Sequence, residues 1–254
     1  MKITFLGTGT SQGIPVIGSD HPVCKSTDPR DKRLRVSAMV EWDQYRYVID
    51  CGPDFRQQML REEVTAINGV LLTHEHSDHT AGIDDIRPFY FRQGNVPFYG
   101  LKRVFEALHE RFAYIFETEN KYPGAPTIEE IEIDKHSTFE LGGQKVVPVE
   151  VWHAELSVLG FRIGDFTYLT DVKTISEEEI EKIKGSKVLV LNALRYKPHV
   201  SHLNISEALA LVDKVKPEKT YFTHISHLMG FHAEVEPTLP ENVFLAYDGL
   251  KIEI

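Results

Sequence analysis

The sequence contains little cysteine and no long apolar run. Its only cysteines, Cys24 and Cys51, could form at most one disulfide, so a fold held together by disulfides is excluded. No segment reaches the ~18 consecutive apolar residues that a membrane-spanning helix requires. The apolar run at the start of the sequence, Met1–Gly7, is too short for a signal peptide. We therefore expect a cytoplasmic protein with reduced thiols and no membrane partner.

Positive charge is also scarce. The chain has 28 lysines and arginines against 38 aspartates and glutamates, which gives a formal net charge of -10. Proteins that bind nucleic acids in general need a basic surface to meet the phosphates, so this balance argues against a nucleic-acid partner. It does not argue against a small anionic substrate, because bound divalent ions would supply local positive charge.

Linkers, repeats and low-complexity segments are absent as well. Charged residues make up 26% and hydrophobic residues 42% of the sequence, as in ordinary soluble globular proteins. A chain of 254 residues can bury a substantial core. We therefore predict one domain that spans residues 1–254.

What the sequence does contain is a dense group of metal-ligand residue types. The run Thr-His-Glu-His-Ser-Asp-His places such residues at His74, His76, Asp78 and His79, directly after an apolar segment that reads as a buried strand. If the backbone stays extended, His74 and His76 project to the same side, and the next two ligand types can face a second ion. The spacing therefore predicts a site for two metal ions.

Three further ligand types stand at the ends of predicted strands. His153 follows a β-rich segment, Asp171 closes the second arm of a predicted hairpin, and His224 closes another β-rich segment. Each of them alone would more often be an ordinary loop residue. The same pattern at four strand ends predicts that these side chains converge on one metal site.

Other segments show clear strand or helix patterns. Strands are expected at 36–42 and 45–50, and helices at 54–63 and 101–112. The segment 115–126 reads as an irregular loop.

Capping residues predict two more helices. Ser176 with Glu179 forms a capping-box pattern before one of them, and Asn204 with Glu207 forms the same pattern before the other. The periodicity of the second helix predicts a buried face made of Ile205, Ala208, Leu209, Val212 and Val215.

Three glycines, Gly7, Gly9 and Gly13, follow the first strand. Neither the lysine of a phosphate-binding loop nor the spacing of a dinucleotide fingerprint accompanies them. We interpret them as turn formers that let the backbone pass close to the metal site.

The ligand motif and its distant partners resemble the metallo-β-lactamase fold family of metal-dependent hydrolases. Within that family, the sequence is most similar to the phosphodiesterase branch typified by phosphoribosyl 1,2-cyclic phosphate phosphodiesterase. The likeness extends over essentially the whole chain and includes segments 7–15, 49–55, 223–227 and 246–250. It implies an α/β fold, a four-layer αββα sandwich in which helices flank two mixed β-sheets.

The resemblance also implies a role for each ligand type. One ion would be held by His74, His76 and His153, the other by Asp78, His79 and His224, with Asp171 bridging the two. His202 matches the position of the general-acid histidine of the family and, together with Asp78, is expected to take part in catalysis. His199 is the alternative for the general-acid role.

Such a ligand set suits the hydrolysis of a phosphodiester. Two ions about 3.5–4 Å apart can share a hydroxide, because metal binding lowers the pKa of water to about 7. They also neutralise charge on the phosphate oxygens during the displacement. The leaving alkoxide then needs a proton, which is the role expected for His202. Histidine and carboxylate ligands suit zinc, manganese and iron, so the sequence leaves the metal open.

A structural zinc site is a further prediction that comes from the resemblance. Well-known members of this branch hold a structural zinc with three cysteines and one histidine. The corresponding positions here are Ser19, His21, Cys24 and His227, of which serine is a poor zinc ligand. Either Asp20 or His232 would have to complete the four-coordinate shell.

We therefore expect a metal-dependent phosphoric diester hydrolase that acts on a small cyclic or diester phosphate. A tRNA 3′-end processing endonuclease of the same superfamily is one alternative, against which the acidic balance and Ser77, where those enzymes usually have glycine, both count. A catalytically silent metal-binding module is the other, and the complete ligand set counts against it. The oligomeric state is left open, with a homodimer among the arrangements considered.

Overall fold

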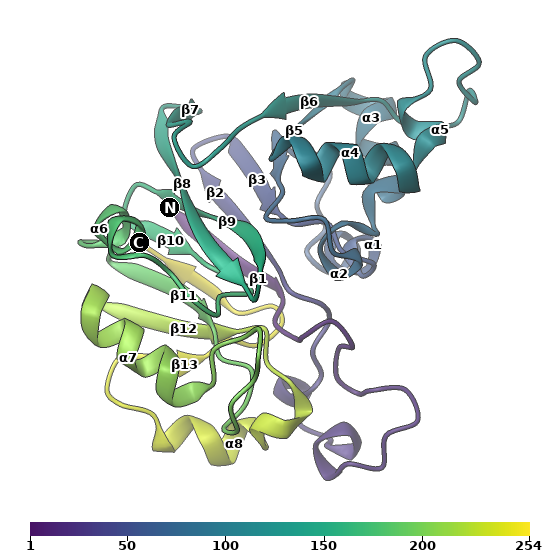
Figure 1. The fold of residues 1–254 in the computed structure, drawn as a ribbon. Helices are drawn as coiled ribbons and strands as arrows, with labels where there is room; N and C mark the ends of the chain where they lie inside the picture. Colours follow the sequence, from purple (N-terminus) through teal and green to yellow (C-terminus); the bar gives the residue numbers. More distant parts are fainter.

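Two β-sheets face each other in the computed structural model, which describes residues 1–254, and helices cover both outer faces (Figure 1). The first sheet contains, in spatial order, β14 (Lys251–Glu253), β1 (Lys2–Gly7), β2 (Ser37–Trp42), β3 (Tyr45–Ile49), β4 (Gly69–Leu71), β5 (Val96–Gly100) and β6 (Ile128–Glu132). The second contains β13 (Val243–Leu245), β12 (Lys219–Thr223), β11 (Val188–Asn192), β10 (Phe166–Tyr168), β9 (Leu156–Ile163), β8 (Gln144–His153) and β7 (Phe139–Leu141). The predicted four-layer α/β sandwich is confirmed.

The helices divide into two groups along the chain. The first group comprises α1 (Phe55–Arg61), α2 (Ser77–Thr80), α3 (Arg87–Gln93), α4 (Lys102–Arg111) and α5 (Ala113–Phe116), and the second comprises α6 (Glu177–Ile183), α7 (Ile205–Val215) and α8 (His232–Val235). Short 3₁₀ helices lie at Pro22–Lys25, Pro29–Asp31, Ile83–Ile86, His227–Met229 and Glu236–Thr238. None of the helices is long and apolar enough to cross a membrane.

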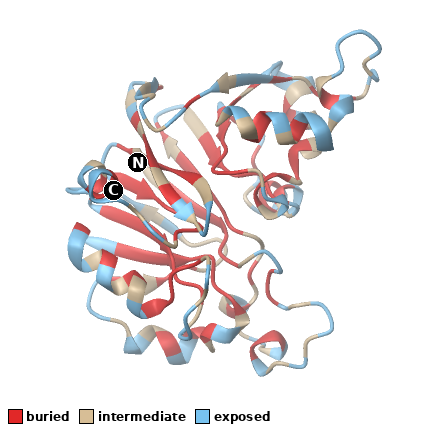
Figure 2. Ribbon diagram, in the orientation of Figure 1, coloured by how far each residue is buried: buried red, intermediate tan, exposed pale blue.

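Three apolar clusters correspond to the three interfaces between layers. The central cluster joins residues of both sheets, for example Phe5 and Val40 with Tyr168 and Val190. A second cluster packs the other face of the second sheet against α6, α7 and α8, and a third packs the first sheet against α1, α3 and α4. Buried residues accordingly follow the strands and the inner faces of the helices (Figure 2). Strands such as β1, β2, β11 and β12 are buried along nearly their whole length, because each sheet has two covered faces.

Each sheet changes from antiparallel to parallel pairing part-way across. Pairing is parallel from β3 through β4 and β5 to β6, and from β10 through β11 and β12 to β13. Parallel strands have their carboxyl ends at the same edge of a sheet, which is where α/β proteins place their ligands. The two parallel halves therefore bring the polar residues that follow β3, β4, β10 and β12 to one region of the molecule.

Most of the predicted elements are confirmed with small changes at their ends. The expected strands 36–42 and 45–50 correspond to β2 and β3, and the expected helices 54–63 and 101–112 correspond to α1 and α4. The segment expected to be irregular includes the last residues of α5 and then a loop that projects from the rest of the molecule (Figure 1).

The two capping predictions have different outcomes. Before α7, the Asn204 side chain accepts a hydrogen bond from the backbone N–H of Glu207, and the Glu207 carboxylate accepts one from the backbone N–H of Asn204, so the capping box is complete. Before α6, Ser176 accepts from the backbone of Glu179, but the Glu179 carboxylate instead accepts from the backbone N–H of Glu150 on β8. The capping hydrogen bond from the Ser176 backbone to the Glu179 carboxylate is therefore replaced by a contact between α6 and β8.

The buried face of α7 also differs from the prediction. Ile205, Ala208, Leu211 and Val215 are buried, whereas Leu209 and Val212 are only partly buried. Apolar residues occur on two neighbouring stripes of this helix, and the angle at which it meets the sheet decides which stripe is covered.

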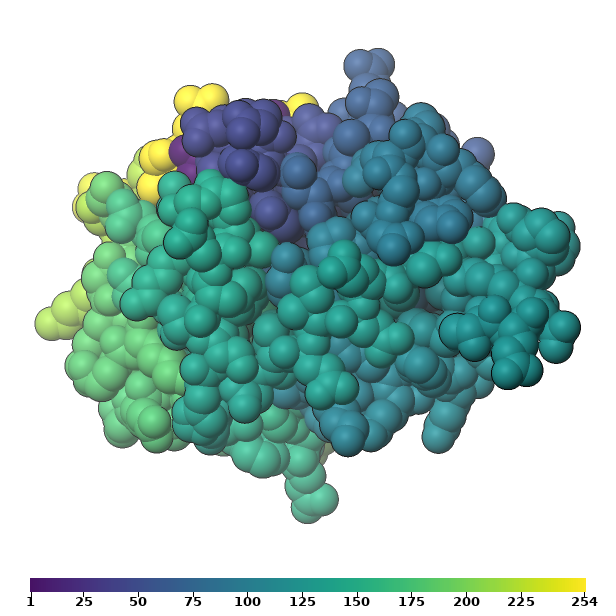
Figure 3. Space-filling model, turned by 90° about the horizontal axis from the view of Figure 1, so that it is seen from above, coloured from purple at the N-terminus to yellow at the C-terminus, as the bar shows by residue number.

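The chain termini are neighbours. β1 and β14 pair antiparallel, with Ile3 opposite Ile252. The first and last residues accordingly lie together, as the purple and yellow atoms at the upper left of Figure 3 show. The pairing places the last strand at the edge of the first sheet.

Candidate metal centre

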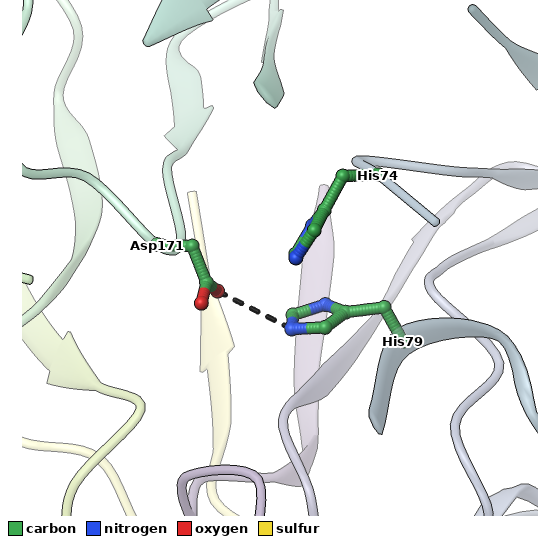
Figure 4. A group of neighbouring side chains, drawn as sticks. All are labelled: His74, His79 and Asp171. Atoms are coloured by element: carbon green, nitrogen blue, oxygen red, sulfur yellow. Dashed lines mark ion pairs between the residues drawn. The ribbon is translucent and has the colours of Figure 1, made fainter. Parts of the chain in front are cut away.

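Donor side chains from both sheets meet at the carboxyl ends of the parallel strands. Three sets of three donors have their ligand atoms within 4.8 Å of one another: His74, His79 and Asp171; Asp78, His79 and His224; and His153, Asp171 and His202. Figure 4 shows the first set, in which His74 and His79 face Asp171 from the opposite side of the site. Six of the seven predicted metal ligands belong to these sets, and Asp171 occurs in two of them. A carboxylate in that position can contact more than one ion.

The seventh predicted ligand, His76, lies at the open side of the site. Its Nδ1 atom is 3.0 Å from Nε2 of His74, and its ring centroid is 5.4 Å from that of His153. These three histidines were predicted to hold one ion together. Their rings are neighbours, so the structure brings the predicted group together.

The second predicted group surrounds Asp171. His79 Nε2 lies 3.3 Å from carboxylate oxygens of both Asp78 and Asp171. His224 Nε2 lies 3.3 Å from Asp171 and 3.7 Å from Asp78. Two imidazoles and two carboxylates therefore face one small space, a donor set that suits borderline divalent ions such as zinc and manganese.

Left-handed backbone conformations help to aim these donors. Asp50, Asp171 and His224 have φ angles of 63°, 57° and 53°, a region that residues other than glycine rarely adopt. Each of the three follows a strand closely, so the chain turns sharply where the strand has ended. Such conformations cost roughly 1–3 kcal/mol each and tend to occur at functional sites. The backbone at these positions therefore fixes the directions in which the three side chains leave the strand ends.

A buried carboxylate that was not among the predicted site residues supports His79 from behind. Asp50, directly after β3, is 2.6 Å from His79 Nδ1 and accepts hydrogen bonds from the backbone and the hydroxyl of Thr73, both at 2.8 Å. A carboxylate on Nδ1 fixes the tautomer and orientation of an imidazole so that Nε2 is free for a metal. The signal was present in the sequence, since Asp50 stands at a strand end exactly as Asp171 and His224 do.

Two other contacts fix the segments that carry donors. Asn192, the last residue of β11, accepts a hydrogen bond at 2.7 Å from the backbone of Val172, next to Asp171. His153 Nδ1 lies 2.8 Å from the carbonyl oxygen of Ser201, which leaves its Nε2 for a ligand role. The loop that carries His202 is thereby tied to the end of β8.

Glycines permit the close approach of chain segments that the site requires. A Cβ atom at Gly52 would overlap with the carbonyl oxygen of Asp78, so no larger residue fits behind the metal loop there. Gly9 forms a bridge with Ile225, the residue after His224. The backbone at Gly9 therefore passes next to the site as predicted, but the atoms that a Cβ there would meet belong to Arg33 and Leu34.

The electrostatic field at the centre strongly favours positive charge. Burial alone would lower the pKa of His79, but Asp171, Asp50 and Asp78 together raise it well above its ordinary value. Burial opposes the charged form of Asp171, yet His224 and His79 hold its pKa well below the usual range. Asp50, Asp78 and Asp171 therefore surround His79 with negative charge, and a divalent cation at this centre would be stabilised by the same carboxylates.

Unpaired nitrogen atoms provide a direct test of whether the residues fit metal ions. His79 Nε2 and both ring nitrogens of His224 are buried and have no hydrogen-bond partner. A buried polar atom without a partner costs about 1–3 kcal/mol, so such atoms are rare unless they serve a purpose. The Nε2 atoms of His79 and His224 each lie 3.3 Å from Asp171, and coordination of an ion there would satisfy both. The donor set therefore fits divalent ions.

His202 lies at the same centre, and the structure adds a second interpretation of it. Its buried Nδ1 is 3.7 Å from Asp171, and its ring lies 4.4 Å from that of His153 and 4.8 Å from that of His224. These distances place it close enough to act on a substrate at the site, and also to act as a further ligand. His199, the alternative proton donor, lies outside it, with its ring 5.1 Å from that of His202.

The residues of the predicted structural zinc site form a second cluster, which we call the loop cluster: His21, Cys24 and His227. The two histidine rings are 4.9 Å apart, and Cys24 is buried. The cluster is not among the sets of three donors whose ligand atoms lie within 4.8 Å. His232 does not complete it, because its ring contacts the buried Arg33 at 3.3 Å. The zinc site at the loop cluster stays a prediction.

Known proteins share both the sequence and the fold of this chain. A family model described as a beta-lactamase superfamily domain matches residues 45–225. A crystal structure of a diphosphatase from the PhnP family is 40% identical, covers 100% of this chain and 97% of its own, and superimposes with a TM-score of 0.92. A Porphyromonas gingivalis protein named octanoyltransferase is 38% identical over 99% of this chain, which corresponds to 51% of that protein. A ribonuclease Z from Methanocaldococcus jannaschii is 26% identical over 56% of this chain and 42% of its own length.

The lengths of these relatives limit what their names imply. This chain spans about half, or less, of the curated relatives that it matches, so their names describe proteins with a further segment outside the match. The diphosphatase, in contrast, matches over nearly its whole length. The family match extends over more than half of the chain, and all seven predicted donors lie within it. The chain therefore belongs to the beta-lactamase superfamily and has the metallo-β-lactamase fold.

Proposed function

We propose that this chain is a phosphodiesterase that uses two divalent metal ions to cleave a small cyclic or diester phosphate, of the phosphoribosyl cyclic phosphate kind. The observation that carries the proposal is the convergence of five imidazoles and two carboxylates from both sheets on one small space. The diphosphatase of the PhnP family, similar over its whole length, supports phosphate ester chemistry. Because both sheets contribute donors, we also propose that residues 1–254 act as one catalytic domain.

The seven ligand residues would be shared between two metal ions. His74, His76 and His153 would hold one ion, Asp78, His79 and His224 the other, and Asp171 would contact both. Bound divalent ions of this kind supply a nucleophile derived from water at neutral pH and neutralise charge on the phosphate. Asp50 and Asn192 hold two of these segments in position from outside.

His202 is the proposed proton donor to the leaving oxygen. Burial, followed by the proximity of His224, lowers the pKa of His202 to about 2, so the ring is neutral on its own at pH 7. An anionic phosphate next to the ring would favour its protonated form. We therefore propose that the His202 ring becomes protonated only when the substrate is bound. Of the two ring nitrogens, Nδ1 is buried and faces Asp171, which leaves Nε2 for the substrate.

The experiment that tests this function is a substrate screen with the purified protein and zinc or manganese. We expect turnover of bis(p-nitrophenyl) phosphate and of at least one cyclic ribose phosphate, loss of turnover in His76→Ala, and reversible inactivation by a chelator. Cleavage of precursor tRNA without any small-diester activity would favour the tRNA endonuclease, which the partial similarity to ribonuclease Z keeps as an alternative. Absence of turnover on all of these substrates would contradict the proposal.

A further inference from the structure

We propose that Arg103 is a positioning residue for the metal site: it fixes the loop that carries His74 and His76 against the hairpin that carries His153. The inference rests on the proposed metal-binding role of these histidines. Arg103 itself touches none of them. It lies on α4, outside both segments, and acts through the residues that it binds.

Arg103 contacts two segments that are far apart in the sequence. Its Nη1 donates to both carboxylate oxygens of Glu75, the residue between His74 and His76. Its Nη2 donates to the carbonyl oxygen of Ser157. Ser157 pairs with Trp152 across the hairpin, one position from His153. A single guanidinium therefore bridges the side chain of Glu75, between His74 and His76, and the backbone of the hairpin that carries His153.

A second arginine of the same helix secures the position of Glu75. Arg111 Nη2 donates to the carbonyl oxygen of Glu75, and its Nε donates to Ala107 at 3.2 Å, within α4. Glu75 is thereby held through its side chain and through its backbone. The apolar face of α4, with Val104 and Leu108 fully buried, anchors both arginines to the first sheet.

The geometry distinguishes this pair from an ordinary surface ion pair. Exposed pairs contribute little, typically up to about 1 kcal/mol, because water screens them and their side chains lose freedom. Here the side chains are only 32% and 23% exposed, and the arginine satisfies three acceptors on two segments. The planar guanidinium suits that task, whereas an ammonium is a single point of charge on a flexible stem. The contact therefore constrains where the two segments lie relative to each other.

The consequence concerns one ion more than the other. His76 is exposed at the open side of the site, and its ring lies 5.4 Å from that of His153 across the two segments. Its position therefore depends on how the loop is held. His79 and His224, by contrast, are buried, and Asp50 contacts His79 from behind. Loss of Arg103 should weaken the ion held by His74, His76 and His153 and leave the second ion largely unaffected.

The test is a calorimetric titration of the metal-free full-length protein with zinc. We expect one zinc equivalent in Arg103→Ala to bind about tenfold more weakly than in the wild type, the low end of the ~10–100-fold range for partners outside the ligand shell, because Arg103 does not touch a ligand. The same equivalent should weaken in His76→Ala, which identifies it. Arg103→Lys should retain only part of the affinity, since lysine keeps the positive charge but lacks the planar guanidinium that can donate to both segments at once.

Glu75→Gln and the double variant show whether the two residues act as one unit. Glu75→Gln should weaken the same equivalent, and Arg103→Ala combined with Glu75→Gln should be no weaker than the worse single variant, because coupled residues are not additive. Lys102→Ala is the matched control. Lys102 is the neighbour of Arg103 on α4, its side chain is 72% exposed and it pairs with Glu106, so zinc binding should not change. If Arg103→Ala cannot be purified folded, Arg103→Lys and Glu75→Gln decide the question.

Two outcomes are distinguishable. A wild-type protein that binds no zinc at this centre would refute the proposed function itself. A wild-type protein with two equivalents, together with Arg103 and Glu75 variants whose affinities match the wild type, would overturn only the positioning role.

Discussion

The metal centre and the loop cluster are both rich in histidine, but they are built on different supports. Donors of the metal centre follow strands of the two sheets, and several of them, including His74, His79 and His224, are fully or almost fully buried. In the loop cluster, His21 precedes one 3₁₀ helix and His227 begins another. The ligand atoms converge in the first region and not in the second. Residue types of the same kind therefore give a preorganised site only where the backbone beneath them is fixed.

The comparison also shows how hydrogen bonds differ between the two regions. In the metal centre, His79 is oriented by the buried carboxylate of Asp50. In the loop cluster, His21 Nδ1 accepts from the backbone of Val23 at 3.3 Å, a local contact that caps its own 3₁₀ helix, and Cys24 Sγ accepts from Val16 at 3.5 Å. Local contacts satisfy those atoms without bringing them together. A metal that used His21 Nδ1 and Cys24 Sγ would have to displace these contacts, although His227 Nδ1 is buried without a partner. At the metal centre, coordination would satisfy the unpartnered Nε2 atoms of both His79 and His224.

The largest effect is expected from Asp171→Ala, which removes the carboxylate shared by the two halves of the metal centre. Activity should be lost, and metal analysis should find less than the wild-type content, because Asp171 faces both His79 and His224 at 3.3 Å. Any ion at the loop cluster should be unaffected, since that cluster has its own ligands. Unchanged metal content with unchanged activity would contradict the shared role of Asp171.

The sequence predicted which residues come together at the candidate metal centre, because their positions at strand ends can be recognised locally. A ligand type directly after a strand needs no knowledge of distant contacts, and parallel strands then bring such positions together. His74, His153, Asp171 and His224 were found in this way. Asp50 fits the same pattern but was noticed only as part of a similar segment. A sequence pattern does not show whether a carboxylate contacts the ion or the histidine behind it.

Other features depended on the tertiary arrangement. Glu179 had the right spacing for a capping box, but its carboxylate binds the backbone of β8, a contact that no local pattern contains. The buried stripe of α7 includes Leu211 in place of Leu209 and Val212, because the approach of the helix to the sheet selects among adjacent apolar stripes. The contacts of Arg103 likewise join three segments that are distant in the chain.

The next effect in size is expected from His202→Ala. If His202 supplies the proton to the leaving oxygen, the rate of the chemical step should fall by about 10²–10⁴ while both ions stay bound. A single-turnover measurement with metal analysis of the same sample separates the two roles that the geometry allows. Loss of metal with an unchanged rate per remaining site would make His202 a ligand.

His199→Ala is the matched control for that experiment. The ring of His199 is adjacent to His202 but belongs to none of the sets of converging donors. We expect its removal to reduce the rate far less than removal of His202. A larger loss in His199→Ala than in His202→Ala would reverse the assignment of the proton donor.

A smaller effect is expected from Asp50→Asn, which retains the shape of the side chain and removes its charge. His79 would lose the carboxylate on Nδ1, and metal affinity should fall by roughly 10–100-fold, as for other partners that orient a ligand. Titration of the metal-free protein with zinc measures this loss of affinity. With excess metal, the rate should return toward that of the wild type, since no catalytic group has been changed. A rate that stays low at saturating metal would indicate a role for Asp50 beyond orientation.

The smallest effect is expected from Cys24→Ser in the loop cluster. If the loop cluster binds a structural zinc, this change should remove one equivalent per chain and leave the rate per catalytic site nearly unchanged, because the donors of the metal centre are anchored to other strands. His232→Ala would be a poor substitute for this test, since it also removes a contact to the buried Arg33. Equal zinc content in wild type and Cys24→Ser would show that the loop cluster binds no metal through Cys24. Convergence of ligand atoms, rather than the presence of suitable residue types, would then be what separates the two regions.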